Sequence, residues 1–460
     1  MAIIKRAFRL SQCILLISFT SFTFPNQSHR IVRITGPDAL NPCEVSIAIN
    51  PANPNNIVGV SMQLGKPGQA RVSNYAYVTT DAGATWKTVA AQNPRSLAQG
   101  DDAVTFDSRG VAYRSYISFD GIRVQRPKRA FSGVYVSSSG DGGQTWNDPT
   151  PVVDHINTVT PFEDKPYLVT DNAPDSPHKN NVYLAWTRFD VYGSKDPEHF
   201  TYIYFSRSTD GGKSFMMPIR ISDTGGDCVD SDNTVEGAVP AVGPKGEVYV
   251  VWSGPKGLVF DKSLDGGLTF GKDKAISPHP GGWDINVPGI NRCNGMPVTK
   301  VDLSNSPRRG AIYVNWIDER NGDPDVFVMS SPDGGETWSA PARVNDDARG
   351  NGKAQFFTWM AVDPADGSVN VVFYDRRDQE GTKTGLTLAR STDGGKTFVN
   401  YKINQEPFAC NEKVFFGDYT GIDAYNGLVT PIYTHFVSEK DLAVSVALFR
   451  FKPGMQELLK

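Results

Sequence analysis

Residues 207–215 read RSTDGGKSF and residues 390–398 read RSTDGGKTF, so the chain of 460 residues repeats itself almost letter for letter. Four further stretches follow the same pattern: TTDAGATW (79–86), SGDGGQTW (139–146), SLDGGLTF (263–270) and SPDGGETW (331–338). The aspartates of the six copies lie 55 to 69 residues apart, at Asp81, Asp141, Asp210, Asp265, Asp333 and Asp393. A motif that recurs with this period indicates stacked supersecondary units.

Short β-rich runs surround the copies of the motif. Runs such as NVYLAW (181–186) lie ahead of a copy, with an earlier run such as YLVTD (167–171) before them. A third run, for example TYIYFSRS (201–208), leads directly into the motif, and a fourth, such as PIRIS (218–222), follows it. Four short antiparallel strands per unit, with no helical period, predict an all-β fold built from the blades of a β-propeller.

The blades outnumber the motifs by one. Residues 415–451 supply three strands without a motif, and the isolated run RIVRIT (30–35) is similar to the fourth strands of the other blades. We therefore expect seven blades, with the N-terminal strand closing the ring; a six-bladed ring with an extra C-terminal module is the alternative. The expected organisation is a signal peptide over 1–28, a propeller over 29–452 and a C-terminal tail over 453–460.

The repeated pattern S-x-D-x-G-x-T-[WF] resembles the Asp box of the sialidase and BNR-repeat propellers, and this resemblance covers nearly all of the mature length. It implies a secreted, carbohydrate-active propeller with sialidase-like glycoside hydrolase activity. The motif itself is expected to be structural, because glycine supplies positive φ angles and the aspartate can bond within the turn. A single-site enzyme does not need one catalytic residue six times over.

Acidic residues recur just before the first strand of successive blades, on the face opposite the repeated turns. They are Glu44, Asp101 with Asp102, Glu163 with Asp164, Glu236 and Asp418, with Gln355 at the same place in one blade. We expect a ring of carboxylates around the channel, in which crowding raises some pKa values as a general acid requires. The alternative is that each acid caps its own strand or pairs with a neighbouring cation.

Arginines gather in the loops expected on that same face. They are Arg123, Arg126, Arg129, Arg188, Arg320, Arg376 and Arg377. Guanidinium groups bind carboxylate or sulfate through two hydrogen bonds, so the cluster favours an anionic carbohydrate ligand. Asp–Arg pairing between loops is the alternative. Aromatic residues could stack on the sugar, with Trp359 the first candidate beside Trp283, Phe356 and Phe357.

Sialidases use a tyrosine nucleophile assisted by a glutamate, an aspartic acid/base and an arginine triad. On the matching side of this chain, the catalytic candidates implied by the resemblance are Glu163, Asp164, Asp418 and Tyr419, with Tyr167 as a second tyrosine. The Arg-Ile-Pro motif of the family is absent, and seven blades differ from the usual six. The triad is therefore not mapped residue by residue.

Two other functions remain open. A polysaccharide lyase acting on uronate-containing polymers would need a histidine or tyrosine base, for which His155 is the first candidate, with His199 and His435 in loops on the same face. A non-catalytic propeller that binds carbohydrate or protein is the other. Turnover assays separate the three.

The N-terminus carries Lys5, Arg6 and Arg9 before an apolar run that ends near residue 24, which is typical of a secretory signal peptide. An uncleaved anchor is the alternative. The net charge of the whole chain is −4, and loss of residues 1–28 would make it more acidic. We expect an extracellular or periplasmic protein without electrostatic attraction to nucleic acid or, after cleavage, to membranes.

Four cysteines lie beyond the signal segment, and an even number in an oxidising compartment favours disulfides, here Cys43–Cys410 and Cys228–Cys293. No zinc-binding spacing is present. The stretch 225–237 could hold calcium through Asp227, Asp230, Asp232 and Glu236, but it lacks the EF-hand spacing, so no cofactor is expected.

Overall fold

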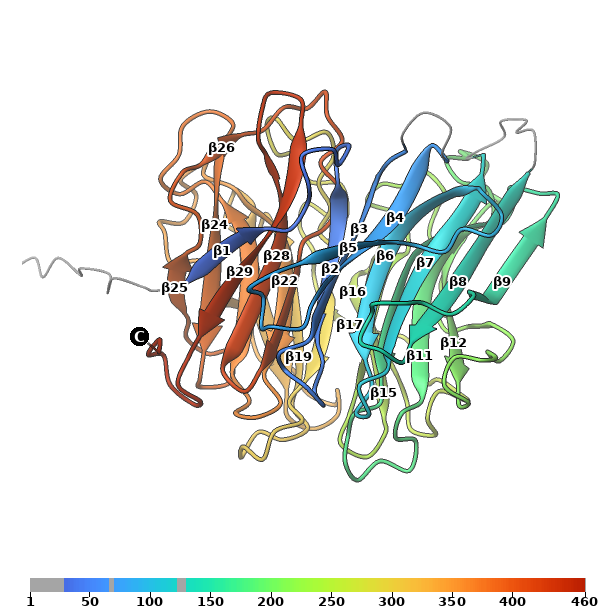
Figure 1. The fold of residues 1–460 in the computed structure, drawn as a ribbon. Helices are drawn as coiled ribbons and strands as arrows, with labels where there is room; N and C mark the ends of the chain where they lie inside the picture. The colour runs from blue at the N-terminus through green and yellow to red at the C-terminus, as the bar shows by residue number, and fades with distance from the viewer. Residues whose placement is uncertain (1–28, 66–69, 122–129, 460) are drawn as a thin grey trace, which may run out of the picture.

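Seven antiparallel sheets surround a common axis in the computed structural model, which describes residues 29–459 apart from 66–69 and 122–129 (Figure 1). The prediction of an all-β, seven-bladed propeller is confirmed, and the six-bladed alternative is wrong. The signal peptide expected over 1–28 lies outside the described residues. Among those described there is no helix that could cross a membrane.

The first strand of each blade is the innermost, because the first strands of neighbouring blades contact one another around the ring. Blades one to three comprise β2 (Cys43–Ile49), β3 (Ile57–Leu64), β4 (Val72–Thr79) and β5 (Lys87–Ala90); β6 (Ala98–Phe106), β7 (Ala112–Asp120), β8 (Phe131–Ser139) and β9 (Thr150–Ile156); β10 (Phe162–Thr170), β11 (Val182–Phe189), β12 (Thr201–Ser208) and β13 (Ile219–Arg220).

Blades four to six comprise β14 (Glu236–Val242), β15 (Val248–Gly254), β16 (Gly257–Ser263) and β17 (Lys274–Ser277); β18 (Val298–Val301), β19 (Ile312–Asp318), β20 (Asp325–Ser331) and β21 (Ala342–Arg343); β22 (Gln355–Val362), β23 (Val369–Asp375), β24 (Lys383–Ser391) and β25 (Val399–Lys402), with β26 (Phe408–Ala409) also on β24. Trp186, Trp252 and Trp316, near the ends of three second strands, are fully buried in the core.

The seventh blade joins the two ends of the chain. It contains β27 (Gly421–Tyr425), β28 (Leu428–Phe436) and β29 (Leu442–Arg450), and its outermost strand is β1 (Arg30–Arg33). β1 runs antiparallel to β29, with Arg30 opposite Leu448 and Arg33 opposite Ser445 (Figure 1). The closure predicted for residues 30–35 is confirmed, and it gives the last blade the same four strands as the others.

The six repeated turns share one hydrogen-bond pattern. In the copy at 208–215, Ser208 Oγ donates to Asp210 Oδ1 at 2.8 Å and Ser214 Oγ donates to Oδ2 at 2.6 Å. Burial opposes ionisation, but these hydrogen bonds lower the pKa of Asp210 to about 2. The aspartates of the motif are thus structural anchors of their turns.

The second glycine of the turn also permits close contact with the preceding blade. Gly335 has φ of +89°, and a Cβ there would lie 2.3 Å from Cε1 of Phe260 in blade four. Trp338, at the end of the same motif, packs edge-on against Phe260 with ring centroids 5.3 Å apart. The turn therefore holds its own blade and also fixes the spacing to the neighbour.

The predicted disulfides Cys43–Cys410 and Cys228–Cys293 are wrong, because all four cysteines of the described chain are free and buried. Each thiol has different neighbours. Cys410 Sγ lies 3.3 Å from Thr384 Oγ1, and Cys228 lies against the backbone of residues 190–191. Cys293 instead contacts the backbone of Phe357. Among the described residues, the ring closes through the β-sheet pairing of β1 with β29 and through non-covalent contacts.

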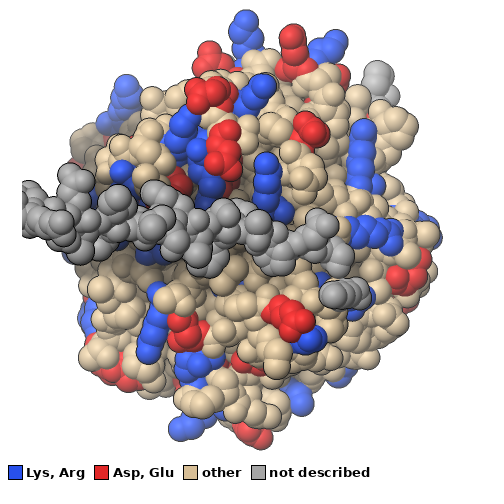
Figure 2. All heavy atoms as spheres, turned by 90° about the vertical axis from the view of Figure 1, so that its left-hand side faces the viewer, with Lys and Arg blue, Asp and Glu red and all other residues tan. Residues whose placement is uncertain are grey.

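Charged side chains are mixed on the outer surface. On the side of the molecule that Figure 2 shows, the blue Lys and Arg side chains are interspersed with the red Asp and Glu side chains. Neither sign dominates that part of the surface, so it gives no sign of a continuous field for steering a charged polymer.

Candidate functional site

The innermost strands carry a repeated irregularity at the end where the acids were predicted. The register shifts in β2, β6, β10, β14 and β22. At each shift one residue has a positive φ angle: Glu44 (52°), Asp101 (51°), Lys165 (49°), Gly237 (79°) and Phe357 (45°). Such β-bulges re-aim side chains, and non-glycine residues in this region cost of order 1–3 kcal/mol each, so a cluster of them suggests function.

Lys165 lies at the centre of the group that these bulges assemble. Its Nζ lies 3.2 Å from Asp164 Oδ2, 3.0 Å from Glu236 Oε1 and 3.4 Å from Asp418 Oδ2. Its side chain is only 2% exposed. Burial opposes the charge, yet these carboxylates raise the pKa of Lys165, which stays protonated.

Arg292, in the link before β18, supplies the second cation. Its Nε donates to Asp418 Oδ1 at 2.7 Å, its Nη2 donates to Oδ2, and its Nη1 lies 3.2 Å from Asp230 Oδ2. Asp230 also accepts hydrogen bonds from the Tyr192 hydroxyl at 2.6 Å and from Trp283 Nε1 at 3.1 Å. Burial alone would raise its pKa, but Lys165 and Arg292 lower the pKa of Asp230, so it is ionised.

Asp101 and Asp164 are neighbouring carboxyl groups beside Lys165. Burial raises the pKa of Asp164 to about 8; the nearby charges of Asp101 and Asp230 add to the effect, and Lys165 opposes it. The Tyr419 hydroxyl donates to Asp101 Oδ1 at 3.2 Å. Asp164 therefore holds a proton at neutral pH next to a second carboxyl group.

The cluster as a whole has more acids than bases. Six carboxyl groups surround the two cations Lys165 and Arg292: Glu44, Asp101, Asp164, Asp230, Glu236 and Asp418. Burial raises the pKa of Glu44 and of Glu236 as well. The site thus contains protonated carboxyl groups next to an ionised one, which is the combination that acid–base chemistry requires.

A cavity of about 760 Å³ opens onto this cluster. Glu44, Asp101, Asp164 and Arg292 are among the polar residues that line it, and the aromatic residues of the lining are Phe119, Phe162, Tyr192 and Phe415. Arg71, Lys413 and Lys440 lie at its exposed margin and pair with no acid in the described part of the chain. Its size suits a sugar ring or a short oligosaccharide.

The structure brings together three of the four catalytic candidates, Asp164, Asp418 and Tyr419. It separates Glu163, whose carboxylate turns into blade three and lies 2.7 Å from His155 Nε2 and 2.8 Å from Arg188 Nε. Trp186 Nε1 donates to its other oxygen at 2.5 Å. Asp102 likewise turns away, into a buried ion pair with Arg114 at 2.5 Å. Adjacent residues of one strand face opposite sides, so only one acid of each doublet reaches the channel.

The arginines proposed for substrate binding have partners in their own surroundings. Arg188 pairs with Glu163, Arg320 with Asp318 and Arg377 with Asp375. Arg376 donates to the carbonyl of Pro288 at 2.8 Å. None of the four lines the 760 Å³ cavity. Arg123, Arg126 and Arg129 lie outside the described residues.

Trp359 is buried beneath the site. Its ring lies 5.0 Å from that of Tyr167 and 6.0 Å from that of Tyr419. It supports the tyrosines from below and does not line the cavity. The three histidines also lie elsewhere: His155 is beside Glu163, His199 beside Ser194 and His435 beside Ser445.

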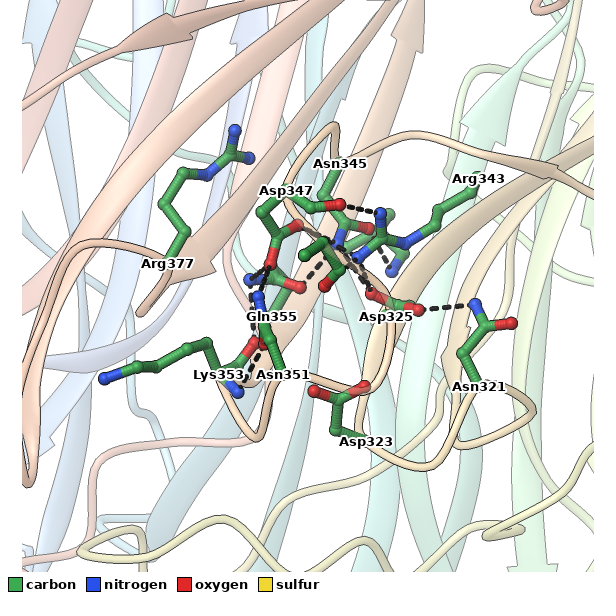
Figure 3. A network of polar contacts seen from close by, with 12 residues as sticks. Asn321, Asp323, Asp325, Arg343, Asn345, Asp347, Asn351, Lys353, Gln355 and Arg377 are labelled. Carbon is green, nitrogen blue, oxygen red and sulfur yellow. Dashed lines mark hydrogen bonds and ion pairs between the residues drawn. The ribbon is translucent and has the colours of Figure 1, made fainter.

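Gln355, the one non-acidic member of the expected ring, belongs to a separate polar network between blades five and six (Figure 3). Asn345 Nδ2 donates to Gln355 Oε1 at 2.5 Å and to Asp325 Oδ1 at 2.6 Å. Arg343 pairs with Asp325 and Asp347. Every one of these contacts joins groups of the protein itself, so the network stabilises the packing of the two blades.

The residues considered for calcium also have protein partners. Asp227 accepts a hydrogen bond from the amide of Val229, and Asp232 accepts one from the amide of Asp284. Asp230 and Glu236 belong to the central cluster. Between Glu236, Asp164 and Asp418 lies the ammonium group of Lys165.

Sequence reasoning missed Lys165 and Arg292. Lys165 adjoins Asp164 in EDKPYLV, but nothing in its local pattern marks a buried lysine. Arg292 lies in a long link without a strand pattern. The only available signal was the excess of acids itself, since buried carboxylates need cations nearby.

No known family model matches the chain. Among solved structures, an ulvan lyase of a new polysaccharide lyase family is similar, with a TM-score of 0.52 and 13% identity over 90% of this chain and 95% of that one. A protein of unknown function from Dyadobacter fermentans has a TM-score of 0.50 and 12% identity, covering 91% and 98%. A Hadza microbial sialidase has a TM-score of 0.49 and 15% identity, covering 86% and 74%.

At these identities the first two similarities establish the fold and nothing finer. The chain is a seven-bladed β-propeller with a buried acid–base cluster at one mouth of its channel.

Proposed function

We propose that the protein is an exported glycoside hydrolase that cleaves acidic glycans in the 760 Å³ cavity. The observation that carries the proposal is the buried carboxyl group of Asp164, which lines that cavity together with Asp101 and contacts Lys165. The signal-peptide pattern at residues 1–28 supports export.

Asp164 is the proton donor in this scheme. Because it stays protonated at neutral pH, it can protonate the oxygen of the glycosidic bond as the bond breaks. Two carboxyl groups that flank the sugar are the usual means of glycoside hydrolysis. Asp101 also lines the cavity and is the second carboxyl group in this scheme, the one that activates water.

Tyr419 acts as a positioning residue here. Burial raises the pKa of Tyr419 well above its usual value, so the hydroxyl stays protonated and donates to Asp101. This role differs from the nucleophile implied by the sialidase resemblance. Lys165 and Arg292 form ion pairs with Asp418 and Asp230 beside the reacting pair.

The preference for an acidic glycan rests on the margin of the cavity. Arg71, Lys413 and Lys440 carry charges that no acid of the described chain neutralises, and a carboxylate or sulfate group of a substrate can pair with them. The ulvan lyase of similar fold was solved with GlcA(1-4)Rha3S bound. Sulfated and uronate-containing oligosaccharides therefore belong among the substrates to test.

The test compares the wild-type protein with Asp164→Asn on fluorogenic sialosides and on anionic polysaccharides. Loss of the general acid lowers kcat by about 10²–10⁴-fold while the protein stays folded. Asp441→Asn is the matched control, because Asp441 also lines the cavity but is exposed and bonded to Ser438. It should keep its turnover.

The products distinguish the alternatives. Release of a saturated sugar supports hydrolysis, whereas absorbance from an unsaturated uronate would make the protein a lyase. Binding of the polysaccharides without turnover would make it a binding module. Full activity of Asp164→Asn would remove Asp164 from the mechanism.

A further inference from the structure

A second cavity, of about 500 Å³, lies between blades five and six on the face of the repeated turns. Arg308 and Tyr313 line it from blade five, as does Trp338 at the end of the repeated turn 331–338. Lys396, from the repeated turn 391–398 of blade six, lines its other side. By strand topology this is the face of the propeller opposite the acid–base cluster.

Three hydrogen-bond donors in this cavity lack partners. Arg308 Nε, the Tyr313 hydroxyl and Trp338 Nε1 are buried, and none has a partner at hydrogen-bonding geometry among the described residues. A Cβ at Gly394 would lie 3.1 Å from Arg308 Nε and 3.4 Å from the Tyr313 hydroxyl, so these two groups are neighbours at the cavity wall. Buried donors without acceptors are costly unless a ligand supplies the acceptor.

The charge of the cavity is positive. Neither Arg308 nor Lys396 forms an ion pair within the described chain, whose salt bridges involve other cations. The acid in the lining, Asp393, accepts hydrogen bonds from Ser391 and Thr397 of its own turn. Burial raises the pKa of Tyr313, so its hydroxyl remains a donor.

The near-identical turn at 208–215 provides an internal comparison. Its glycines face Tyr113 of blade two as those of 391–398 face Tyr313 of blade five. There the Tyr113 hydroxyl lies 3.4 Å from Asp107 Oδ2, and Arg109 pairs with the same carboxylate at 2.5 Å. In blade five the corresponding acid, Asp302, accepts hydrogen bonds from the hydroxyl groups of Ser304 and Ser306. Arg308 Nε and the Tyr313 hydroxyl are thereby left without an acceptor, although Arg308 Nη2 donates to the carbonyl of Thr392 at 3.2 Å.

We propose that this cavity is a second binding site, for a carboxylate or sulfate group carried on a molecule the size of a sugar ring. The oxyanion accepts hydrogen bonds from Tyr313 and Arg308 and pairs with Lys396 at the entrance. Trp338 adds an N–H donor on an aromatic wall, and a cavity of this volume admits a monosaccharide. The site does not depend on the proposed catalytic activity.

The test is calorimetric titration of the full chain with sodium D-glucuronate and with D-glucose 6-sulfate, with neutral D-glucose as the reference. We expect one or both anions to bind and D-glucose not to bind. Arg308→Gln should weaken binding about tenfold and Tyr313→Phe about threefold, as the loss of a charge-assisted and of a neutral hydrogen bond predicts.

The matched controls are Arg109→Gln and Tyr113→Phe at the equivalent, self-paired site, which should leave binding unchanged. Lys413→Gln, at the margin of the other cavity, separates the two sites. The proposal fails if neither anion binds, if D-glucose binds equally well, or if Lys413→Gln removes the binding and Arg308→Gln does not. Turnover at the other mouth should survive Arg308→Gln.

Discussion

Aspartates on the two faces of the propeller have opposite environments. On the turn face, Asp210 receives hydrogen bonds from Ser208, Ser214 and the backbone, and its pKa falls to about 2. On the face with the 760 Å³ cavity, Asp164 is one of six carboxyl groups around two cations, and burial raises its pKa to about 8. An aspartate whose carboxylate accepts several hydrogen bonds has a structural role. A buried aspartate with few hydrogen-bond donors has a raised pKa and is a candidate catalytic residue.

We expect the largest effect on stability from removal of the central cation, Lys165. Lys165→Met leaves Asp164, Glu236 and Asp418 buried without their ammonium partner. Removing one member of a buried ion pair costs about 3–5 kcal/mol of unfolding free energy, which chemical denaturation measures. Lys262→Met, whose partner Glu336 is exposed, is the control and should change stability by less than about 1 kcal/mol. Equal effects would contradict the central role of Lys165.

The second test is the pH dependence of stability. Because burial raises the pKa of Asp164 to about 8, the folded state keeps a proton that the unfolded state loses near pH 4. Stability from this group is therefore fully present below about pH 4 and falls as pH rises towards 8, with a slope near 1.4 kcal/mol per pH unit for one proton. Asp164→Asn should flatten urea-midpoint profiles over this range. An unchanged slope would place the proton elsewhere.

A third test concerns the contact of the turn with the neighbouring blade. Gly335→Ala adds a Cβ within 2.3 Å of Phe260 at a positive φ angle, and we expect a loss of about 2–3 kcal/mol in thermal or chemical unfolding. Gly352→Ala has a similar φ of +72° but meets no atom within 4 Å. It should cost only the conformational part, about 1 kcal/mol. Similar losses would mean that the contact adds nothing.

The smallest expected effect comes from one motif aspartate. Asp210→Asn keeps the size of the side chain but weakens its bonds to Ser214 and Ser208 in an exposed turn. We expect about 1 kcal/mol or less of destabilisation at pH 7 and no change in turnover. Because hydrogen bonds lower the pKa of Asp210, this contribution should vanish as the pH falls from about 4 to 2. Lost turnover would contradict a purely structural role.

Much of the fold could be predicted because each copy of the motif marks one blade. The seventh blade could be predicted because RIVRIT resembles an outer strand. The positions of Glu44, Asp101, Asp164, Glu236 and Asp418 followed from their common place before each first strand. Lys165 could not be predicted, since its inward direction depends on a bulge with φ of 49° that strand alternation does not reveal. The sequence also left open whether Arg188 faced a ligand or Glu163, and only spatial contacts decide between them.

The closure of the ring has a consequence for how the chain folds. Blades one to six form from strands that follow one another along the chain, but blade seven needs β1 beside β29, and thus Arg30 beside Leu448. Contacts of such long sequence separation form slowly because the chain between them must first be ordered. During synthesis, the first strand must wait for the last hairpin to emerge. Until β1 pairs with it, β29 has an exposed edge, and a circular permutant that makes β1 continuous with β29 would turn this slow closure into a local hairpin.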